Sequence, residues 1–161
     1  MTSPPGQEVV EVRGSGLYQL VVRLEKKRLI TVGRHGRFTF PAGYYVYTGS
    51  GRRGLESRIA RHLRRQKRMR WHIDYLLRYG HVLEVRRYGD DKTECELSRR
   101  AGRMSNGRVI VRGFGSSDCS CPTHLFYFPR NPSSGLGAGQ VLLDCHRTVS
   151  NHDSRACAVT R

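Results

Sequence analysis

The sequence has few acidic residues and no long apolar run. Its 161 residues contain 13 Asp and Glu against 29 Lys and Arg, which gives a formal net charge of +16 at pH 7. No stretch approaches the roughly 20 apolar residues that a membrane-spanning helix needs. A charge of this size indicates a polyanionic partner, and nucleic acid is a better candidate than an acidic membrane surface or an acidic protein.

Two marks of a secreted protein are also missing. The amino terminus has no basic flank followed by an apolar segment, so we expect no secretory signal there. The cysteines are odd in number, which argues against a framework of disulfides and favours reduced thiols or metal ligands. They are Cys95, Cys119, Cys121, Cys145 and Cys157. We therefore expect a cytoplasmic protein.

The length of the chain suits one domain with its own apolar core. Residues 1–13 are a Pro- and Gly-containing lead-in, which we expect to be flexible. Periodic apolar residues occupy positions 14–130, and these predict the folded domain. Residues 131–161 have Val141–Leu143 as their one apolar anchor, so we expect a loosely ordered tail.

Apolar and β-branched runs alternate with turn residues along the domain. Leu17–Leu24 has the continuous apolar character of a central strand, and Leu29–Val32 with Arg37–Phe40 predicts an inserted hairpin. Further strands are expected at Tyr44–Thr48, Val82–Arg87, Val109–Val111 and Leu125–Phe128, and helices at residues 54–66, 71–77 and 92–101. The predicted fold class is α/β (α+β), with a central, mostly antiparallel sheet flanked by helices.

The stretch Gly43–His62 joins a strand, a glycine turn and a basic helix. Backbone N–H groups of a glycine turn, a helix N-terminus and arginine side chains all bind phosphate oxygens well. A strand followed by a helix with a solvated basic face explains the same pattern, and the stretch alone does not separate the two interpretations. Under the first, the residues that contact nucleic acid are Gly49, Ser50, Arg52, Arg53, Arg61, Arg65, Lys67 and His72.

Two tyrosines lie beside glycines on strands that should be neighbours, in Gly16-Leu17-Tyr18 and Tyr47-Thr48-Gly49. Such a pair is usually part of a core. Here Arg58 and His62 follow at helical spacing, and Glu94 follows on a later helix. In this order the sequence resembles the GIY-YIG endonuclease superfamily, and residues 14–128 are similar to its small, stand-alone Uri-type branch. The interval between the tyrosines is longer than in many members, and the expected hairpin accounts for the excess.

The resemblance implies a GIY-YIG-like fold and hydrolysis of DNA phosphodiester bonds with Mg²⁺ (or Mn²⁺). Glu94 would bind the metal, since a hard cation needs oxygen ligands. Arg58 would neutralise charge on the phosphorane, and Tyr18 would orient or deprotonate the attacking water. His62 and Tyr47 would support that geometry.

Other interpretations of the same residues stay open. Glu94 is a surface carboxylate under the simplest alternative, and Glu96, two residues on, cannot face the same metal on a regular helix. The basic groove suits a DNA- or RNA-binding module without catalysis, and the charge alone suits a structural RNA-associated protein.

A second metal site is possible around Cys119, Cys121 and His124, with Cys95 as a fourth ligand from the Glu94 helix. Thiolates and imidazole at close spacing are typical ligands of structural Zn²⁺. Reduced, partly buried thiols in a tight loop are the alternative.

Overall fold

The computed structural model describes residues 16–89, 91–137 and 139–144. Within these ranges the chain forms the strands β1 (Leu17–Leu24), β2 (Arg28–Val32), β3 (Gly36–Phe40), β4 (Gly43–Ser50), β5 (His81–Tyr88), β6 (Arg108–Val109), β7 (Leu125–Phe128) and β8 (Gln140–Asp144). The helices are α1 (Leu55–Leu63), α2 (His72–Leu77) and α3 (Glu94–Gly102), with a short 3₁₀ turn at Ser133–Gly135.

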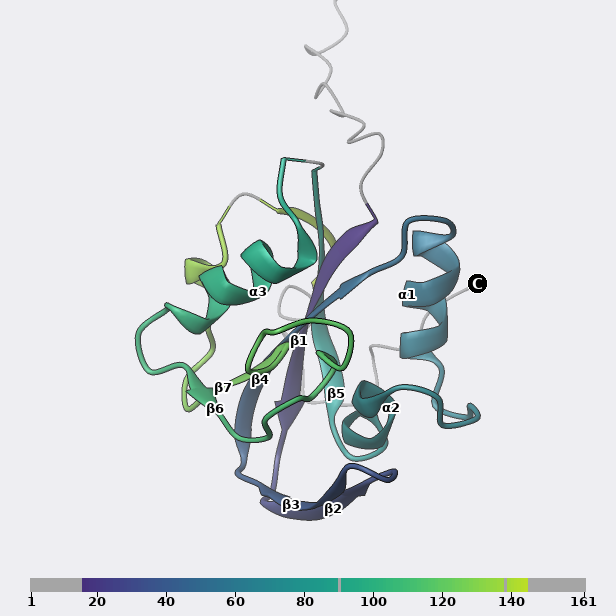
Figure 1. Ribbon diagram of the computed structural model, residues 1–161, viewed down its shortest axis with the longest axis vertical. Coiled ribbons are helices and arrows are strands. Elements are labelled where there is room, and N and C mark those ends of the chain that lie inside the picture. Colours follow the sequence, from purple (N-terminus) through teal and green to yellow (C-terminus); the bar gives the residue numbers. More distant parts are fainter. Residues whose placement is uncertain (1–15, 90, 138, 145–161) are drawn as a thin grey trace, which may run out of the picture.

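Six of the strands form one sheet in the order β6-β7-β4-β1-β5-β8, and its neighbouring strands are antiparallel. β1 lies between β4 and β5 and is buried along nearly its whole length, which explains its continuous apolar sequence. β2 and β3 form a separate hairpin between β1 and β4 in the chain (Figure 1). The predicted fold class, the central strand and the inserted hairpin are confirmed.

The helices cover both faces of the sheet, with α1 and α2 on one side and α3 on the other (Figure 1). Successive side chains of β1 alternate between the two layers, as the period of a strand requires. Tyr18, Leu20 and Val22 belong to the larger core cluster with α1, α2 and the hairpin. Leu17 and Val21 belong to two smaller clusters that α3 helps to form. One end of β1 is therefore within reach of both α1 and α3.

α1 is shorter than the helix expected over residues 54–66. It ends at Leu63 because Arg64 adopts an extended backbone, with φ −69° and ψ 133°. Lys67 Nζ then donates to the backbone oxygen of His62 at 2.7 Å. A cation at this position also interacts favourably with the helix dipole.

Residues 131–137 and 139–144, which belong to the expected tail, contact the sheet. Leu136 is 3 % exposed, and β8 pairs with β5 at the edge of the sheet. Arg86 donates to the backbone oxygens of Ser133 and Gly137 at 2.8 and 2.9 Å. The two Arg86 contacts join a polar side chain of β5 to backbone oxygens, so a search for apolar periodicity within the segment itself could not reveal them. Residues 145–161 and the lead-in at 1–13 lie outside the described residues.

Candidate active site

The candidate site lies where β1 begins and β4 ends, and its glycines are explained by close approaches. Gly51 N–H donates to the Gly16 oxygen at 2.7 Å, and a Cβ on Gly16 would come 2.4 Å from the Gly51 carbonyl carbon. A Cβ on Gly49 would lie 2.5 Å from Tyr18 Oη. These distances leave no room for a side chain at Gly16 or Gly49, so both glycines allow the two strands and the Tyr18 ring to meet.

Tyr18, Tyr47 and His62 form a buried aromatic group at this end of the sheet. Tyr18 Oη and His62 Nε2 are 2.6 Å apart and share a hydrogen bond. The Tyr47 ring centroid lies 6.4 Å from that of Tyr18 and 6.1 Å from that of His62. The two tyrosines face each other because Tyr18 pairs with Gly49 in the β1–β4 register, which places Tyr47 one pleat away.

Arg58, Ser50 and Glu94 form a polar chain beside this aromatic group. Arg58 Nη1 donates to the backbone oxygen of Ser50, and Ser50 Oγ donates to Glu94 Oε2 at 2.5 Å. The Arg58 guanidinium also lies over the Trp71 ring, 4.8 Å from its centroid. The structure thus brings together five predicted catalytic residues from β1, β4, α1 and α3: Tyr18, Tyr47, Arg58, His62 and Glu94.

Burial and neighbouring charge set the protonation of these groups. The pKa of Tyr18 is raised well above its ordinary value, mainly by burial and then by Tyr47, although Arg58 opposes the change. Burial likewise raises the pKa of Tyr47. Burial, assisted by Lys67, lowers the pKa of His62 to about 4. Both tyrosines and His62 are consequently neutral at pH 7.

Glu94 stays ionised in the same environment. Burial alone would raise its pKa, but hydrogen bonds from His124 and Ser50 together with the charge of Arg58 outweigh burial and lower it. Glu94 is 29 % exposed, so its carboxylate is reachable from solvent. Among the described residues it is therefore the carboxylate that both faces Arg58 and is available to a cation.

Glu96 has a different role in the same helix. Its backbone N–H donates to Thr93 Oγ1 at 3.2 Å, and its carboxylate accepts from Thr93 N–H at 2.7 Å. This reciprocal pair is a capping box, which satisfies the first N–H groups of α3. The capping box therefore holds the Glu96 carboxylate at the end of the helix and away from the site. Glu94, the first residue of α3, instead accepts from Ser50 in the site.

Three of the arginines expected to contact nucleic acid are exposed, namely Arg52, Arg53 and Arg65. Arg52 and Arg53 lie in the turn before α1, and Arg65 follows its end. Ser50 is half-buried beside them and donates to Glu94, and Gly49 is buried against Tyr18. A basic rim thus borders the site on the α1 side.

The other expected contacts already have partners in the protein. Arg61 donates through both terminal nitrogens to Asp74, each at 2.8 Å, and Lys67 holds the end of α1. His72 Nδ1 accepts from Gly115 N–H at 3.0 Å, and burial lowers the pKa of His72. These three residues position elements around the site, and their place as phosphate contacts stays a prediction.

Sequence reasoning did not find the central role of Asp74. Its side chain is 0 % exposed and accepts from Arg61 and from the backbone N–H groups of Arg70 and Trp71. The Arg61 guanidinium also lies 4.2 Å from the Trp71 ring centroid. Trp71 therefore contacts both Arg58 and Arg61, and Asp74 fixes the segment that carries it. An acidic residue three positions after the lone tryptophan, in a strongly basic region, was the available signal.

The cysteine and histidine cluster predicted as a second metal site is formed. One ligand atom from each of Cys95, Cys119, Cys121 and His124 lies within 4.8 Å of the others. Cys95 comes from the first turn of α3, and the remaining three come from the loop before β7. The four residues can hold a metal ion.

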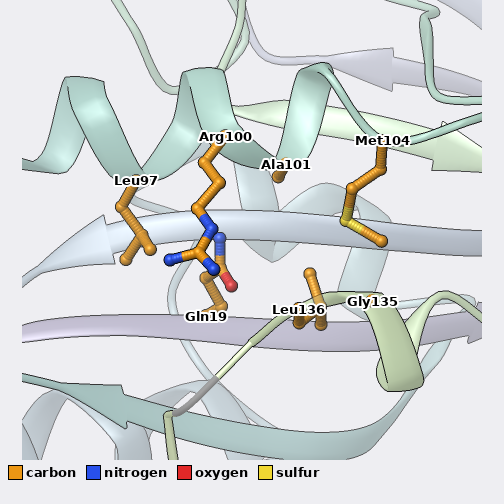
Figure 2. A pocket seen from close by; sticks show the side chains of 7 residues that line it. All are labelled: Gln19, Leu97, Arg100, Ala101, Met104, Gly135 and Leu136. Atoms are coloured by element: carbon orange, nitrogen blue, oxygen red, sulfur yellow. The ribbon is translucent and has the colours of Figure 1, made fainter.

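A small pocket on the α3 face is separate from both sites. Figure 2 shows Arg100 reaching from α3 toward Gln19 of β1. The pocket is lined by Gln19, Leu97, Arg100, Ala101, Met104, Gly135 and Leu136. None of the predicted site residues contributes to this lining, so we assign it no function.

The molecule is thus a mixed α/β protein with a tyrosine, arginine and glutamate site at one end of an antiparallel sheet. The family model described as "Domain of unknown function DUF123" matches residues 17–142, and the chain belongs to this family. No curated protein and no solved structure matched the chain. Within the described part of the chain, no helix combines the length and the apolar character that crossing a membrane would require.

Proposed function

We propose that this protein is a metal-dependent endonuclease of the GIY-YIG superfamily, of its Uri-type branch, that hydrolyses phosphodiester bonds in DNA. The observation that carries the proposal is the meeting of Tyr18, Arg58, His62 and Glu94 at one end of the sheet. These residues come from separate elements, and a merely structural pattern gives no reason for an ionised glutamate to join a neutral tyrosine there.

Glu94 can serve as the single protein ligand of a bound Mg²⁺ (or Mn²⁺). The carboxylate is ionised and partly exposed, and Mg²⁺ is commonly held by one or two carboxylates together with phosphate oxygens and waters. When bound, the cation would stabilise negative charge on the phosphate that is being cleaved.

Tyr18 and His62 provide a path for the proton of the attacking water. Because Tyr18 is a neutral phenol, it can accept that proton only as its own passes to His62 Nε2, 2.6 Å away. The water oxygen forms the new bond to phosphorus while the bond to the leaving oxygen breaks, and solvent protonates the leaving oxygen. Arg58, held over Trp71, would bind the phosphate oxygens more tightly as their charge grows.

Two further assignments belong to the proposal. We propose Zn²⁺ as the metal of the cysteine and histidine cluster, because three thiolates with one imidazole are a standard donor set for structural zinc. Free thiols at Cys95, Cys119 and Cys121 suit a reducing compartment, and we propose the cytoplasm.

The test is cleavage of labelled DNA and RNA by purified protein, with and without Mg²⁺ or Mn²⁺. The proposal expects metal-dependent cleavage of DNA by the wild type. Glu94→Gln should lower the rate by several orders of magnitude, as expected when a catalytic metal is lost. Glu96→Gln is the matched control, because glutamine also completes a capping box. Binding without cleavage under all conditions would instead show a nucleic-acid-binding module.

A further inference from the structure

The two ring nitrogens of His124 face different partners. Nδ1 lies 2.9 Å from Glu94 Oε1, and Nε2 lies 3.5 Å from Cys119 Sγ. In a tetrahedral zinc site with usual bond lengths, a thiolate sulfur and an imidazole nitrogen are about 3.5 Å apart. Nε2 is therefore the nitrogen that would ligate the metal, and Nδ1 is the nitrogen that faces the Glu94 carboxylate.

The backbone on both sides of this contact is held by the sheet and by α3. His124 N–H donates to the Phe114 oxygen at 2.8 Å, and the His124 oxygen accepts from Thr48 N–H at 3.0 Å. Glu94 and Cys95 are the first two residues of α3. One helical turn thus supplies the carboxylate of the candidate active site and a thiol of the cluster.

We infer that zinc bound by Cys95, Cys119, Cys121 and His124 positions Glu94 through His124, as a zinc–histidine–carboxylate chain. The role of Glu94 as a catalytic metal ligand, and zinc as the metal of the cluster, rest on the proposed function, but the coupling of the zinc site to Glu94 does not depend on whether the protein cleaves DNA. His124 is a positioning residue in this scheme, and the zinc has no contact with the phosphate.

The arrangement leaves Glu94 able to bind a second cation. Each carboxylate oxygen carries two lone pairs. Ser50 Oγ uses one on Oε2, and His124 Nδ1 lies 2.9 Å from Oε1, so lone pairs remain on both oxygens. With zinc in place the imidazole is fixed, and the carboxylate is held on both sides. Without zinc the ring can turn away from Cys119, and Glu94 then loses the partner on Oε1.

The coupling must act in both directions, because a carboxylate that accepts from a ligating histidine strengthens the metal bond of that histidine. Glu94→Gln should accordingly weaken zinc binding by about 10- to 100-fold, whereas Glu96→Gln, which caps α3 from the solvent side, should leave it unchanged.

The experiment measures zinc in the full chain, purified without chelator, of wild type, Glu94→Gln and Glu96→Gln. Elemental analysis should find about one zinc per wild-type chain, and competition with a chromophoric chelator should give the predicted difference in affinity between the two variants. Co²⁺ in place of zinc should show a thiolate charge-transfer band, with ligand-field bands that Glu94→Gln shifts and Glu96→Gln does not. Absence of zinc in the wild type, or equal affinities in the two variants, overturns the inference.

Two further measurements separate the positioning role from a general loss of structure. Cys121→Ser should lose zinc; if this variant does not fold, wild-type protein stripped by chelator takes its place. In folded, zinc-free protein, half-maximal cleavage should need more Mg²⁺ while metal-free DNA affinity stays the same. An unchanged Mg²⁺ requirement refutes the positioning. Wild type that binds zinc as predicted but never cleaves DNA refutes the proposed function alone.

Discussion

Tyr18 Oη is hydrogen-bonded to His62 Nε2 across 44 positions of sequence, and this bond joins the start of β1 to the last turn of α1. Both side chains are almost fully buried. Burial keeps the histidine neutral, with its pKa lowered to about 4. The bond that aligns the proposed proton path is therefore also a source of pH-dependent stability.

We predict that His62 destabilises the protein in mild acid. The histidine takes up a proton near pH 6.5 in the unfolded chain but only near pH 4 in the folded one. Between these values the unfolded state binds more protons, so the free energy of unfolding falls as pH falls, by about 3 kcal/mol in total. Above pH 6.5 this contribution is absent.

Urea denaturation of wild type and His62→Gln at several pH values checks this. Glutamine keeps an acceptor for Tyr18 but does not titrate, so the difference in unfolding free energy between the two proteins should change as pH drops below 6.5. Parallel pH profiles would mean that His62 takes up its proton at the same pH in the folded and the unfolded protein, as it would if water reached it.

The fold could be predicted largely because the core pattern is local. The apolar run at Leu17–Leu24 matches β1 residue for residue, and Leu125–Phe128 matches β7. Both strands are buried throughout or nearly so, which removes the ambiguity of half-exposed segments. Glu94 was selected over Glu96 by resemblance, and the capping box supplies a physical reason for their different directions.

What could not be predicted depends on polar contacts between distant elements. Arg61 and Arg65 look alike in a basic helix, yet Arg61 is paired with Asp74 and Arg65 is exposed. Charge patterns do not reveal a partner thirteen positions away. Similarly, Arg86 holds the segment after residue 131 through backbone oxygens, which have no signature in the side-chain sequence.

We predict that Arg58→Ala weakens both DNA binding and cleavage, and cleavage more. Arg58 meets the phosphate before the reaction and more strongly in the transition state. Arg65→Ala should reduce affinity and lower the slope of log affinity against log salt by about 1, with the maximal cleavage rate unchanged. Salt-dependent binding assays and single-turnover kinetics measure both effects. Equal losses of cleavage in the two variants would mean that Arg58, like Arg65, contributes only general electrostatic attraction for DNA.

The Arg61–Asp74 pair should be a main source of stability. Asp74→Asn leaves the guanidinium, 16 % exposed, without its charged partner, and we expect a loss of about 3–5 kcal/mol in unfolding free energy. Glu56→Gln is the control, since Glu56 pairs with Arg87 while 75 % exposed, and such pairs contribute about 1 kcal/mol or less. Denaturant titrations would show whether the two losses differ; similar small losses would mean that water reaches Asp74.

Leu136 should contribute to stability although it lies in the segment after residue 131, which the sequence predicts to be loosely ordered. Leu136 is 3 % exposed and packs with Val21, Val46 and Phe126 on the α3 side of the sheet. Leu136→Ala should therefore cost about 2–4 kcal/mol of unfolding free energy, the range for removing a buried leucine side chain.

Leu142→Ala is the matched control, because Leu142 lies in β8 of the same segment but is 45 % exposed, and its loss should change stability little. Thermal or urea unfolding of the two variants separates a docked segment from a loose one. If Leu136→Ala unfolds at the same denaturant concentration as wild type, the segment contributes no packing energy in solution, and truncation at residue 131 should then leave the fold intact. If only Leu136→Ala is weakened, the folded unit extends beyond residue 130 and includes Leu136.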